Sequence, residues 1–212
     1  MTIQLDHVFV LTSPGAPEAD ALLRAGLQEG PSNEHPGQGT ANRRFFFANT
    51  TLEFLFVADI AQAMNGPGKG LRFVERAIDV SGSPFGLVTR VIDNVEEPNF
   101  PAWKYFPDYF PKPMCFFVGN NSDIFDEPLC VCMPPALPKA SPPTSTNTLW
   151  ELTELVLATP VGKPSMALTA FEQCDLVTVE YGKPHALTLT FNNGTSGESL
   201  SLQPDAPLTL HW

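Results

Sequence analysis

The chain has 212 residues, 43% hydrophobic content and a formal net charge of −11, which is typical of one packed globular unit or two small ones. Its 22 prolines favour strands joined by stiff loops over a helical bundle, because proline breaks helices and is excluded from sheet interiors. The only basic cluster is the pair Arg43 and Arg44, so nucleic acid and anionic membrane surfaces are not expected partners.

The amino terminus and the cysteines favour a cytoplasmic location. Asp6 and His7 interrupt the first apolar run and no basic segment precedes it, which argues against a signal peptide. The sequence has no run of 18 apolar residues, the length that a membrane-crossing helix needs. The cysteines lack the paired C-x-x-C spacing of a zinc site, and we expect buried free thiols at Cys115, Cys130, Cys132 and Cys174.

The amino-terminal region predicts a strand, a helix and a hairpin in that order. Residues 2–12 alternate as a strand does, and residues 13–26 predict a short helix that ends at a glycine. Residues 29–40 are rich in Gly, Pro, Ser and Asn and predict a loop, whereas 42–57 predict two strands around a tight turn. The alternation places on one face of the first strand Ile3, Leu5, His7, Phe9 and Leu11.

The middle region predicts a short helix at 68–80 and strands at 84–93, 114–120 and 129–134. Between these strands, residues 96–113 combine prolines with aromatic side chains, and no regular element fits them.

The pattern of the amino terminus returns after a linker. Residues 134–148 are rich in Pro, Ser and Thr and predict an extended, exposed connection. A strand, a short helix, a hairpin and closing strands are then expected at 149–160, 163–174, 176–194 and 199–212. We interpret this as a weak internal repeat.

The element order and the residues "LDHVFVL…HPGQGTANRRFFF…LEFLFV" resemble the vicinal-oxygen-chelate superfamily, in its glyoxalase-like branch. That superfamily also holds extradiol dioxygenases and bleomycin-resistance proteins. The resemblance covers residues 1–58 closely and 149–212 in element order. It implies an α+β fold of βαβββ modules that curl mixed sheets around a cavity, with modules paired within one chain or across a homodimer.

On this basis the first module spans 1–133, including an extended strand-and-loop segment at 59–133. A second, degenerate module spans 149–212, and the two are expected to form one compact unit.

The resemblance also implies a divalent metal in the cavity. In that superfamily a His on the first strand and a Glu on the last strand of each module hold it, and His7 and Glu53 occupy those places here. Aligning Leu5 with Leu152 puts Glu154 opposite His7 as a further ligand. Imidazole and carboxylate donors suit Zn, Ni, Mn or Fe(II), which would make His7 and Glu53 catalytic as well.

For each of these two residues, a purely structural role is the alternative. His7 alone fits a core histidine with a satisfied hydrogen bond. Glu53 stands among apolar strand residues and is costly to bury unless it meets something polar. That partner is either a cavity shared with His7 or an ion pair with Arg43 or Arg44.

The loop "HPGQGTANRR" supplies candidates for the cavity rim. Its two glycines permit tight turns, and Thr40, Asn42 and Arg43 are candidates for binding a polar or carboxylate group of a substrate. A capped turn with a surface arginine is the alternative. Trp103 and Tyr105 are candidates for an aromatic wall of the pocket, and an aromatic patch on a sheet or at a dimer contact is the alternative.

The sequence therefore predicts a glyoxalase-like protein that acts on a small oxygen-rich molecule. The expected chemistry is that of a metal-dependent lyase, isomerase or dioxygenase. The alternative is a metal-free protein that binds or sequesters a small molecule in the same cup, as resistance proteins do.

Overall fold

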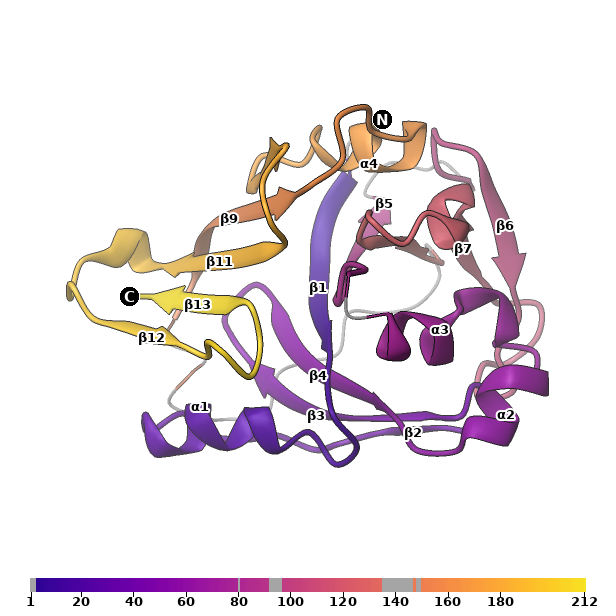
Figure 1. The fold of residues 1–212 in the computed structure, drawn as a ribbon, viewed down its shortest axis with the longest axis horizontal. Helices are drawn as coiled ribbons and strands as arrows, with labels where there is room; N and C mark the ends of the chain where they lie inside the picture. The colour runs from indigo at the N-terminus through magenta and orange to yellow at the C-terminus, as the bar shows by residue number, and fades with distance from the viewer. Residues whose placement is uncertain (1–2, 80, 92–96, 135–146, 148–149) are drawn as a thin grey trace.

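The computed structural model describes residues 3–79, 81–91, 97–134, 147 and 150–212. It holds two mixed β-sheets with short helices around them, so the chain is α+β with a cupped sheet, as the sequence predicts (Figure 1). The linker expected at 134–148 lies, apart from residues 134 and 147, outside the described residues.

The larger sheet has eight strands in the order β2-β3-β4-β1-β5-β8-β7-β6. Its first half consists of β1 (Ile3–Leu11), β2 (Glu34–His35), β3 (Thr40–Phe46) and β4 (Thr51–Val57). Its second half consists of β5 (Phe85–Val91), β6 (Ala102–Tyr105), β7 (Phe116–Gly119) and β8 (Leu129–Met133). The hairpin predicted within 42–57 is confirmed by the antiparallel pairing of β3 with β4.

The two halves of this sheet repeat one strand order. In each half the first strand pairs in parallel with the fourth, as β1 does with β4 and β5 with β8. The halves meet through the antiparallel pair β1 and β5, and the sheet curls into a cup (Figure 1). The strands that complete the cup therefore come from residues 85–133, whereas the second module is expected from the sequence at 149–212.

The carboxyl-terminal region forms a separate sheet in the order β10-β9-β11-β13-β12, which does not repeat the order of the cup. Its strands are β9 (Leu152–Thr159), β10 (Val177–Tyr181), β11 (Ala186–Phe191), β12 (Ser199–Ser201) and β13 (Leu208–His211). The hairpin expected at 176–194 is absent from these described residues, because β9 lies between β10 and β11. Helix α4 (Met166–Phe171) connects β9 to β10, and a parallel pair needs such a crossover.

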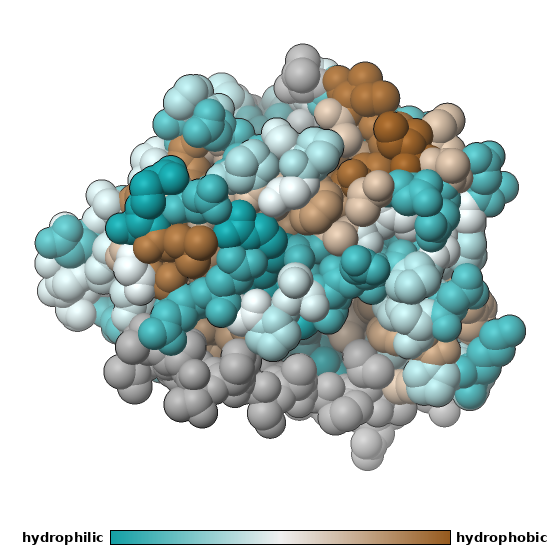
Figure 2. All heavy atoms as spheres, turned by 90° about the horizontal axis from the view of Figure 1, so that it is seen from below, coloured by the Kyte–Doolittle hydropathy of each residue, from teal (hydrophilic) through white to brown (hydrophobic). Residues whose placement is uncertain are grey.

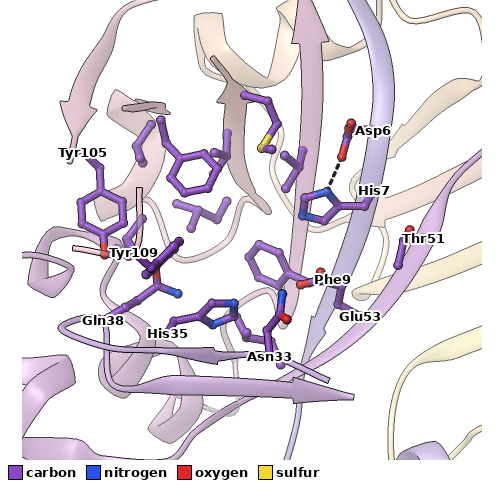
Figure 3. A pocket seen from close by; sticks show the side chains of 18 of the residues that line it. Asp6, His7, Phe9, Asn33, His35, Gln38, Thr51, Glu53, Tyr105 and Tyr109 are labelled. Carbon is purple, nitrogen blue, oxygen red and sulfur yellow. Dashed lines mark hydrogen bonds and ion pairs between the residues drawn. The ribbon is translucent and has the colours of Figure 1, made fainter. Parts of the chain in front are cut away.

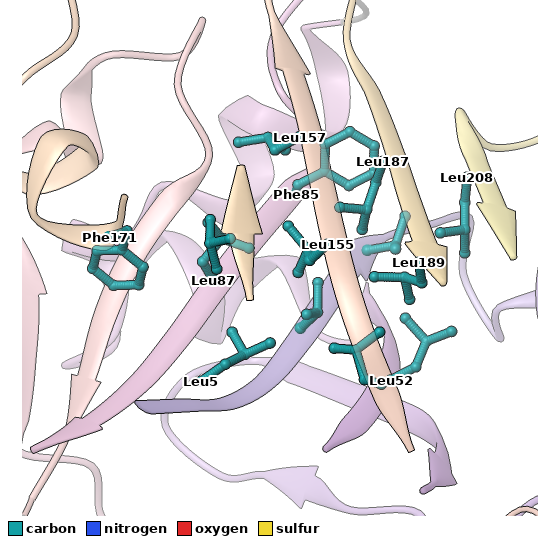
Figure 4. Packing of buried hydrophobic residues seen from close by; sticks show 14 of the residues in the cluster. Leu5, Leu52, Phe85, Leu87, Leu155, Leu157, Phe171, Leu187, Leu189 and Leu208 are labelled. Carbon is teal, nitrogen blue, oxygen red and sulfur yellow. The ribbon is translucent and has the colours of Figure 1, made fainter. Parts of the chain in front are cut away.

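The smaller sheet packs against the outer face of the cup. Leucines of β9, β11 and β13 share one buried cluster with apolar residues of β1, β4 and β5 (Figure 4). Cys130 and Cys132 point to this outer face and Cys115 and Cys174 are also buried, so the prediction of buried free thiols is confirmed. The carboxyl-terminal region therefore covers the back of the cup and leaves its inner face open.

A β-bulge in β1 changes which of its residues face the cup. The register with β5 shifts between Leu5 and His7, so Leu5 and Val8 lie on the same, outer face. His7 and Phe9 face the cavity, and Asp6, at the shift, lines it beside them. The strict alternation predicted for residues 2–12 is wrong at this point, because a bulge inserts one unpaired residue into a strand.

Two other elements differ from the prediction. Strand β6 lies within residues 96–113, where no regular element is expected, because its backbone pairs with β7. Helix α2 (Ile60–Asn65) has no counterpart in the prediction. Helix α1 (Asp20–Arg24) and helix α3 (Phe73–Ile78) lie within the segments predicted to be helical.

The surface is polar over most of the face seen in Figure 2, with hydrophobic side chains gathered in separate patches. Over the described part of the chain, every helix is too short or too polar to cross a membrane.

A buried carboxylate joins the cup to α4. Glu127 is only 1% exposed and accepts hydrogen bonds from the backbone N–H and the hydroxyl of Ser165, each at 2.6 Å, and from the amide of Asn121 at 2.9 Å. Arg76 holds the neighbouring turn through the carbonyl of Glu127 at 2.9 Å. These bonds fix where α4 begins.

We expect Glu127→Ala to lower the free energy of unfolding by about 2–4 kcal/mol, because it removes the acceptor of three hydrogen bonds, two from Ser165 and one from the buried amide of Asn121. Urea unfolding at neutral pH measures the change. The matched control is Glu180→Ala, which removes a partly exposed carboxylate that pairs with Lys183, and it should cost less than about 1 kcal/mol. Equal losses in the two variants would contradict the role assigned to Glu127.

Candidate functional site

A cavity of about 420 Å³ occupies the inner face of the cup, a volume that suits a small organic molecule (Figure 3). The two halves of the sheet line it with different chemistry. The first half contributes most of the polar side chains, namely Asp6, His7, Asn33, Glu34, His35, Gln38, Arg44, Thr51 and Glu53, together with the apolar Phe9, Phe46 and Leu55. The second half contributes a mostly apolar wall, namely Val88, Tyr105, Phe116, Val118, Leu129, Val131 and Met133, with Arg90 as its charged residue.

Asp6 connects two cationic side chains at the cavity wall. One of its oxygens, Oδ1, lies 2.7 Å from Nδ1 of His7. The other, Oδ2, accepts hydrogen bonds from Nε and Nη2 of Arg90 at 3.0 and 2.8 Å. Asp6 and Arg90 are 13% and 16% exposed, so this ion pair is largely shielded from solvent. Each oxygen of Asp6 is therefore committed to a different partner, which fixes the plane of the carboxylate.

These contacts shift the pKa values of both Asp6 and His7. Burial by itself raises the pKa of Asp6, but the hydrogen bonds and positive charges of His7 and Arg90 outweigh it and hold that pKa well below the usual range. Burial by itself lowers the pKa of His7. The charge of Glu53 and the hydrogen bond and charge of Asp6 outweigh that effect, so the pKa of His7 lies above its ordinary 6.5.

Glu53 faces the same cavity and is left without a close partner. No hydrogen bond reaches its carboxylate from any described residue, and no described cation lies within the 4.0 Å of an ion pair. Its negative charge acts to raise the pKa of His7 and that of His35, although burial outweighs this effect at His35. The sequence left two environments open for Glu53, a cavity shared with His7 or an ion pair with Arg43 or Arg44. The structure favours the shared cavity.

Arg44 stands opposite Glu53 in the pairing of β3 with β4, but its guanidinium binds elsewhere. Its Nε donates to the carbonyl of Pro31 at 2.7 Å, and its Nη2 donates to Oδ1 of Asn33 at 3.1 Å. The cation also lies 4.9 Å from the centre of the Phe46 ring. Arg44 therefore supplies positive potential to the cavity without neutralising Glu53 by direct contact.

The rim of the cavity joins the two halves of the cup. Tyr109 donates a hydrogen bond from its hydroxyl to Oε1 of Gln38 at 3.0 Å, and its ring lies 5.3 Å from that of His35. Nε2 of Gln38 donates to the hydroxyl of Thr40 at 2.7 Å, and that hydroxyl is 2.9 Å from Nδ1 of His35. Burial lowers the pKa of His35, so its ring is neutral at neutral pH. The sequence predicts a tight turn in this loop, and Gly37 has a left-handed φ of 77°.

Tyr105 contributes to the aromatic wall that the sequence predicts. It is 1% exposed, lines the cavity and stacks on Phe116 with ring centres 6.1 Å apart. Burial raises the pKa of its hydroxyl, which lies beside the hydroxyl of Tyr109. The ring centres of Trp103 and Tyr105 lie 6.2 Å apart, but the side chain of Trp103 borders a shallow groove outside the cup.

The other predicted site residues lie away from the cavity. Thr40 and Asn42 are both 2% exposed and support the loop above it, Asn42 through a 2.8 Å bond from the N–H of Asn33. Arg43 points to the opposite face of β3 and pairs with Asp20 and Glu29. Glu154 is exposed on β9, in the second sheet. The structure thus brings together His7 and Glu53 with Tyr105, and not Arg43, Trp103 or Glu154.

The donors present fit only one half of the metal site that the resemblance implies. Such a site needs a His and a Glu from each half of the cup. The cavity-facing positions of β5 and β8 are Gly86, Val88, Arg90, Leu129, Val131 and Met133. None of these side chains is a metal ligand of that type. Within the described ranges, no group of three His, Cys, Asp or Glu side chains could hold a metal ion.

Comparisons with known proteins add information about the fold. No family model matches the sequence. No curated protein matches it either. A solved structure of a hypothetical protein from Staphylococcus aureus is similar, with a TM-score of 0.55 and 11% identity over 100% of this chain and 99% of that one. A hypothetical protein from Bacillus halodurans C-125 aligns with 67% of this chain and 100% of its own, at 13% identity and a TM-score of 0.43. The curled mixed sheet is thus shared with a known structure and is compatible with a glyoxalase-like fold.

Asp6, Arg90 and Arg44 are among the cavity residues that sequence reasoning missed. The alternation predicted for residues 2–12 puts Asp6 on the face opposite His7, and only the bulge turns its side chain toward the cavity. Arg90 comes from a strand 84 residues away in sequence, so no local pattern connects it with Asp6. Arg44 was available as the cavity-facing alternative to Arg43, since alternation along β3 gives it the same face as Phe46.

We expect Asp6→Asn to lower the pKa of His7, because the variant loses the negative charge and the carboxylate acceptor. NMR titration of the His7 ring measures this directly. A raised pKa makes the imidazolium stabilising in full below pH 6.5, and this stabilisation is lost as the pH rises through the raised value. The variant should therefore lose more stability relative to wild type below pH 6.5 than at pH 9. An unchanged or higher His7 pKa would contradict the arrangement.

A gain of ligands tests the metal-site argument. If the site lacks donors from the second half of the cup, Val88→His with Met133→Glu should strengthen Zn²⁺ or Ni²⁺ binding at least about tenfold, as added metal ligands do. Isothermal titration of chelator-treated protein measures both affinities, with His7→Ala in the same background as control. Stoichiometric binding by the wild type that the added ligands do not improve would show that the chain holds a metal by other means.

Proposed function

We propose that the protein binds a small molecule in the cup, with an oxygen-bearing polar end and an aromatic or apolar body, and that it needs no metal to do so. The observation that supports this is the uneven lining of one cavity, in which residues 6–53 supply most of the polar side chains and residues 88–133 supply a mostly apolar wall. Ligand sites in general combine a mostly apolar lining with a few polar groups that set orientation.

The polar end of such a ligand belongs beside His7 and Glu53. Nδ1 of His7 is occupied by Asp6, so its Nε2 is the nitrogen left for a ligand. Glu53 is a carboxylate that accepts no hydrogen bond from any described residue, and a ligand donor would relieve the cost of its partial burial. A hydroxyl group would meet both partners, because it can donate to Glu53 and accept from Nε2 of His7.

The body of the ligand belongs against the second half of the cup. Val118 and Val131 pair across β7 and β8 and both line the cavity. Tyr105 and Phe116 add two stacked rings beside them. Burial of an apolar ring here would contribute roughly 25 cal/mol for each Å² removed from water.

Between the two functions that the sequence predicts, this arrangement favours metal-free binding over a metal-dependent lyase, isomerase or dioxygenase. The metal-dependent reading rests on His7 and Glu53 alone, because the second half of the cup offers Val88 and Met133 at cavity-facing positions. The similar structure from Staphylococcus aureus is that of a hypothetical protein, so it supports the fold and names no activity.

A dye and a cavity-filling substitution test the proposal. The fluorescent probe 8-anilinonaphthalene-1-sulfonate has an aromatic body and a polar, oxygen-bearing group, and we expect it to bind with a stoichiometry of one in the presence of chelator. Val131→Trp should weaken its binding at least about tenfold, because the indole occupies the space that the dye needs.

The matched control is Val156→Trp, a half-buried position on the strand β9 of the second sheet, outside the cavity. It should leave the affinity for the dye unchanged. Dye binding that survives Val131→Trp, or that both substitutions weaken equally, would contradict the cup as the binding site.

A further inference from the structure

We propose that the hydroxyl of Tyr105 forms a second polar subsite inside the cup, where it donates a hydrogen bond to an uncharged carbonyl oxygen of the ligand. The ligand class is a small neutral molecule with a hydroxyl group at one end of an apolar body and a ketone, ester or amide carbonyl at the other. The proposal rests on the proposed binding function, which assigns the hydroxyl end of the ligand to His7 and Glu53.

Tyr105 carries a buried hydroxyl that no described residue binds. The side chain is 1% exposed and lines the cavity from β6. Its hydroxyl oxygen is shielded from solvent and has no hydrogen-bond partner among the described residues. Buried polar groups as a rule have a partner, because an unpaired one loses its bonds to water without replacement. A ligand in the cavity would supply the missing acceptor.

The packing of the Tyr105 ring does not require its hydroxyl. Tyr105 pairs with Phe116 across β6 and β7, and the two rings stack with an angle of 16° between their planes. Trp103 packs on the same ring from within β6. A phenylalanine would keep these ring contacts without burying an unpaired donor. The hydroxyl is therefore explained by a partner that enters the cavity and not by the stability of the fold.

The polar groups of the rim already bind one another. Tyr109 lies beside Tyr105, but the geometry between their two hydroxyls is not that of a hydrogen bond. Tyr109 donates its hydroxyl proton to Oε1 of Gln38 at 3.0 Å, and Nε2 of Gln38 donates to the hydroxyl of Thr40 at 2.7 Å. This chain of bonds is complete without Tyr105, so the hydroxyl proton of Tyr105 is left for a ligand.

The charges around the subsite favour an uncharged acceptor. Burial raises the pKa of Tyr105, and the negative charge of Asp108 adds to this effect, so the phenol keeps its proton at neutral pH. An anionic group bound to Tyr105 would be repelled by Asp108, whereas a carbonyl oxygen accepts the hydrogen bond without adding a charge. The two arginines of the lining are bonded elsewhere, Arg90 to Asp6 and Arg44 to the loop before β2.

The two polar ends lie on opposite sides of the cup. In Figure 3 Tyr105 stands at one side of the cavity and His7 and Glu53 stand at the other, with apolar side chains drawn between them. Val118 and Val131, which pair across β7 and β8, belong to this apolar lining. A ligand that meets both ends therefore carries a hydroxyl group and a carbonyl group separated by an apolar body.

Matched pairs of probes test the subsite. One pair is 4-hydroxyacetophenone and 4-ethylphenol, and a longer pair is 4-(4-hydroxyphenyl)butan-2-one and 4-butylphenol. Within each pair a methylene group replaces the ketone, so the difference in affinity isolates the contact of the carbonyl oxygen. NMR titration of the ¹⁵N-labelled full chain in the presence of chelator measures the Kd of each probe, and the same spectra show that the protein is folded.

We expect Tyr105→Phe to weaken the binding of at least one ketone at least about threefold and to leave its alkyl counterpart unchanged, because the variant loses one hydrogen-bond donor. The C=O stretching frequency of the bound ketone in infrared spectra should be lower in the wild type than in Tyr105→Phe, since a hydrogen bond weakens the C=O bond. The matched control is Tyr181→Phe, which removes a shielded phenolic hydroxyl from β10, outside the cup, and should change no affinity.

Four outcomes would overturn the proposal. Ketone affinities that Tyr105→Phe leaves unchanged, or an equal loss of ketone and alkyl binding, would show that the hydroxyl makes no contact with the carbonyl. Tighter binding of the anion 4-hydroxybenzoate that depends on Tyr105 would show that the uncharged class is wrong. If the dye binds the cup and none of the four probes does, the subsite is wrong and the proposed binding function stands. If neither the dye nor any probe binds, the binding function itself is wrong.

Discussion

The antiparallel pairing of β1 with β5 is the constraint on which the cup depends. It joins the two four-stranded halves, each of which has its own parallel pair, and so makes one curled sheet from residues 3–133. The bulge in β1 lies in this same pairing. It turns Asp6 toward the cavity beside His7, where Arg90 of the partner strand meets it at 2.8 Å. One backbone irregularity thus both shapes the sheet and assembles the charged group in its centre.

Apolar residues on both faces of the central strands follow from this architecture. Val8 and Val10 of β1 join the core beneath the second sheet, while Phe9 belongs to the separate cluster around the cavity. Without the sheet of residues 150–212, the outer face of the cup would expose its leucines and phenylalanines to water. The carboxyl-terminal region therefore stabilises the cup from behind and contributes no residue to the cavity lining.

The electrostatic potential of the cavity depends on the unequal pairing of two of its carboxylates, Asp6 and Glu53. Asp6 is shared between two cationic groups, whereas Glu53 has none within ion-pair distance among the described residues. Arg44 could have paired with Glu53 across the strands, yet Pro31 and Asn33 of the loop before β2 bind it instead. Low-dielectric surroundings strengthen both effects, because burial removes the screening that water provides. The result is a polar end that offers one donor and one acceptor to whatever enters the cup.

The sequence by itself determined the first strand and the hairpin of β3 and β4, because these follow from local alternation. The α+β class and the place of His7 and Glu53 at one cavity were implied by the resemblance, and the cost of burying a lone carboxylate left Glu53 either that cavity or an ion pair. Only the tertiary structure decided that residues 85–133 complete the cup, since strand order depends on backbone pairing between distant segments. It alone brought Arg90 to Asp6, because a bulge leaves no mark on the hydrophobic pattern. It also placed Glu154 in another sheet and apolar side chains opposite His7, because an aligned repeat in sequence does not fix which segments meet in space.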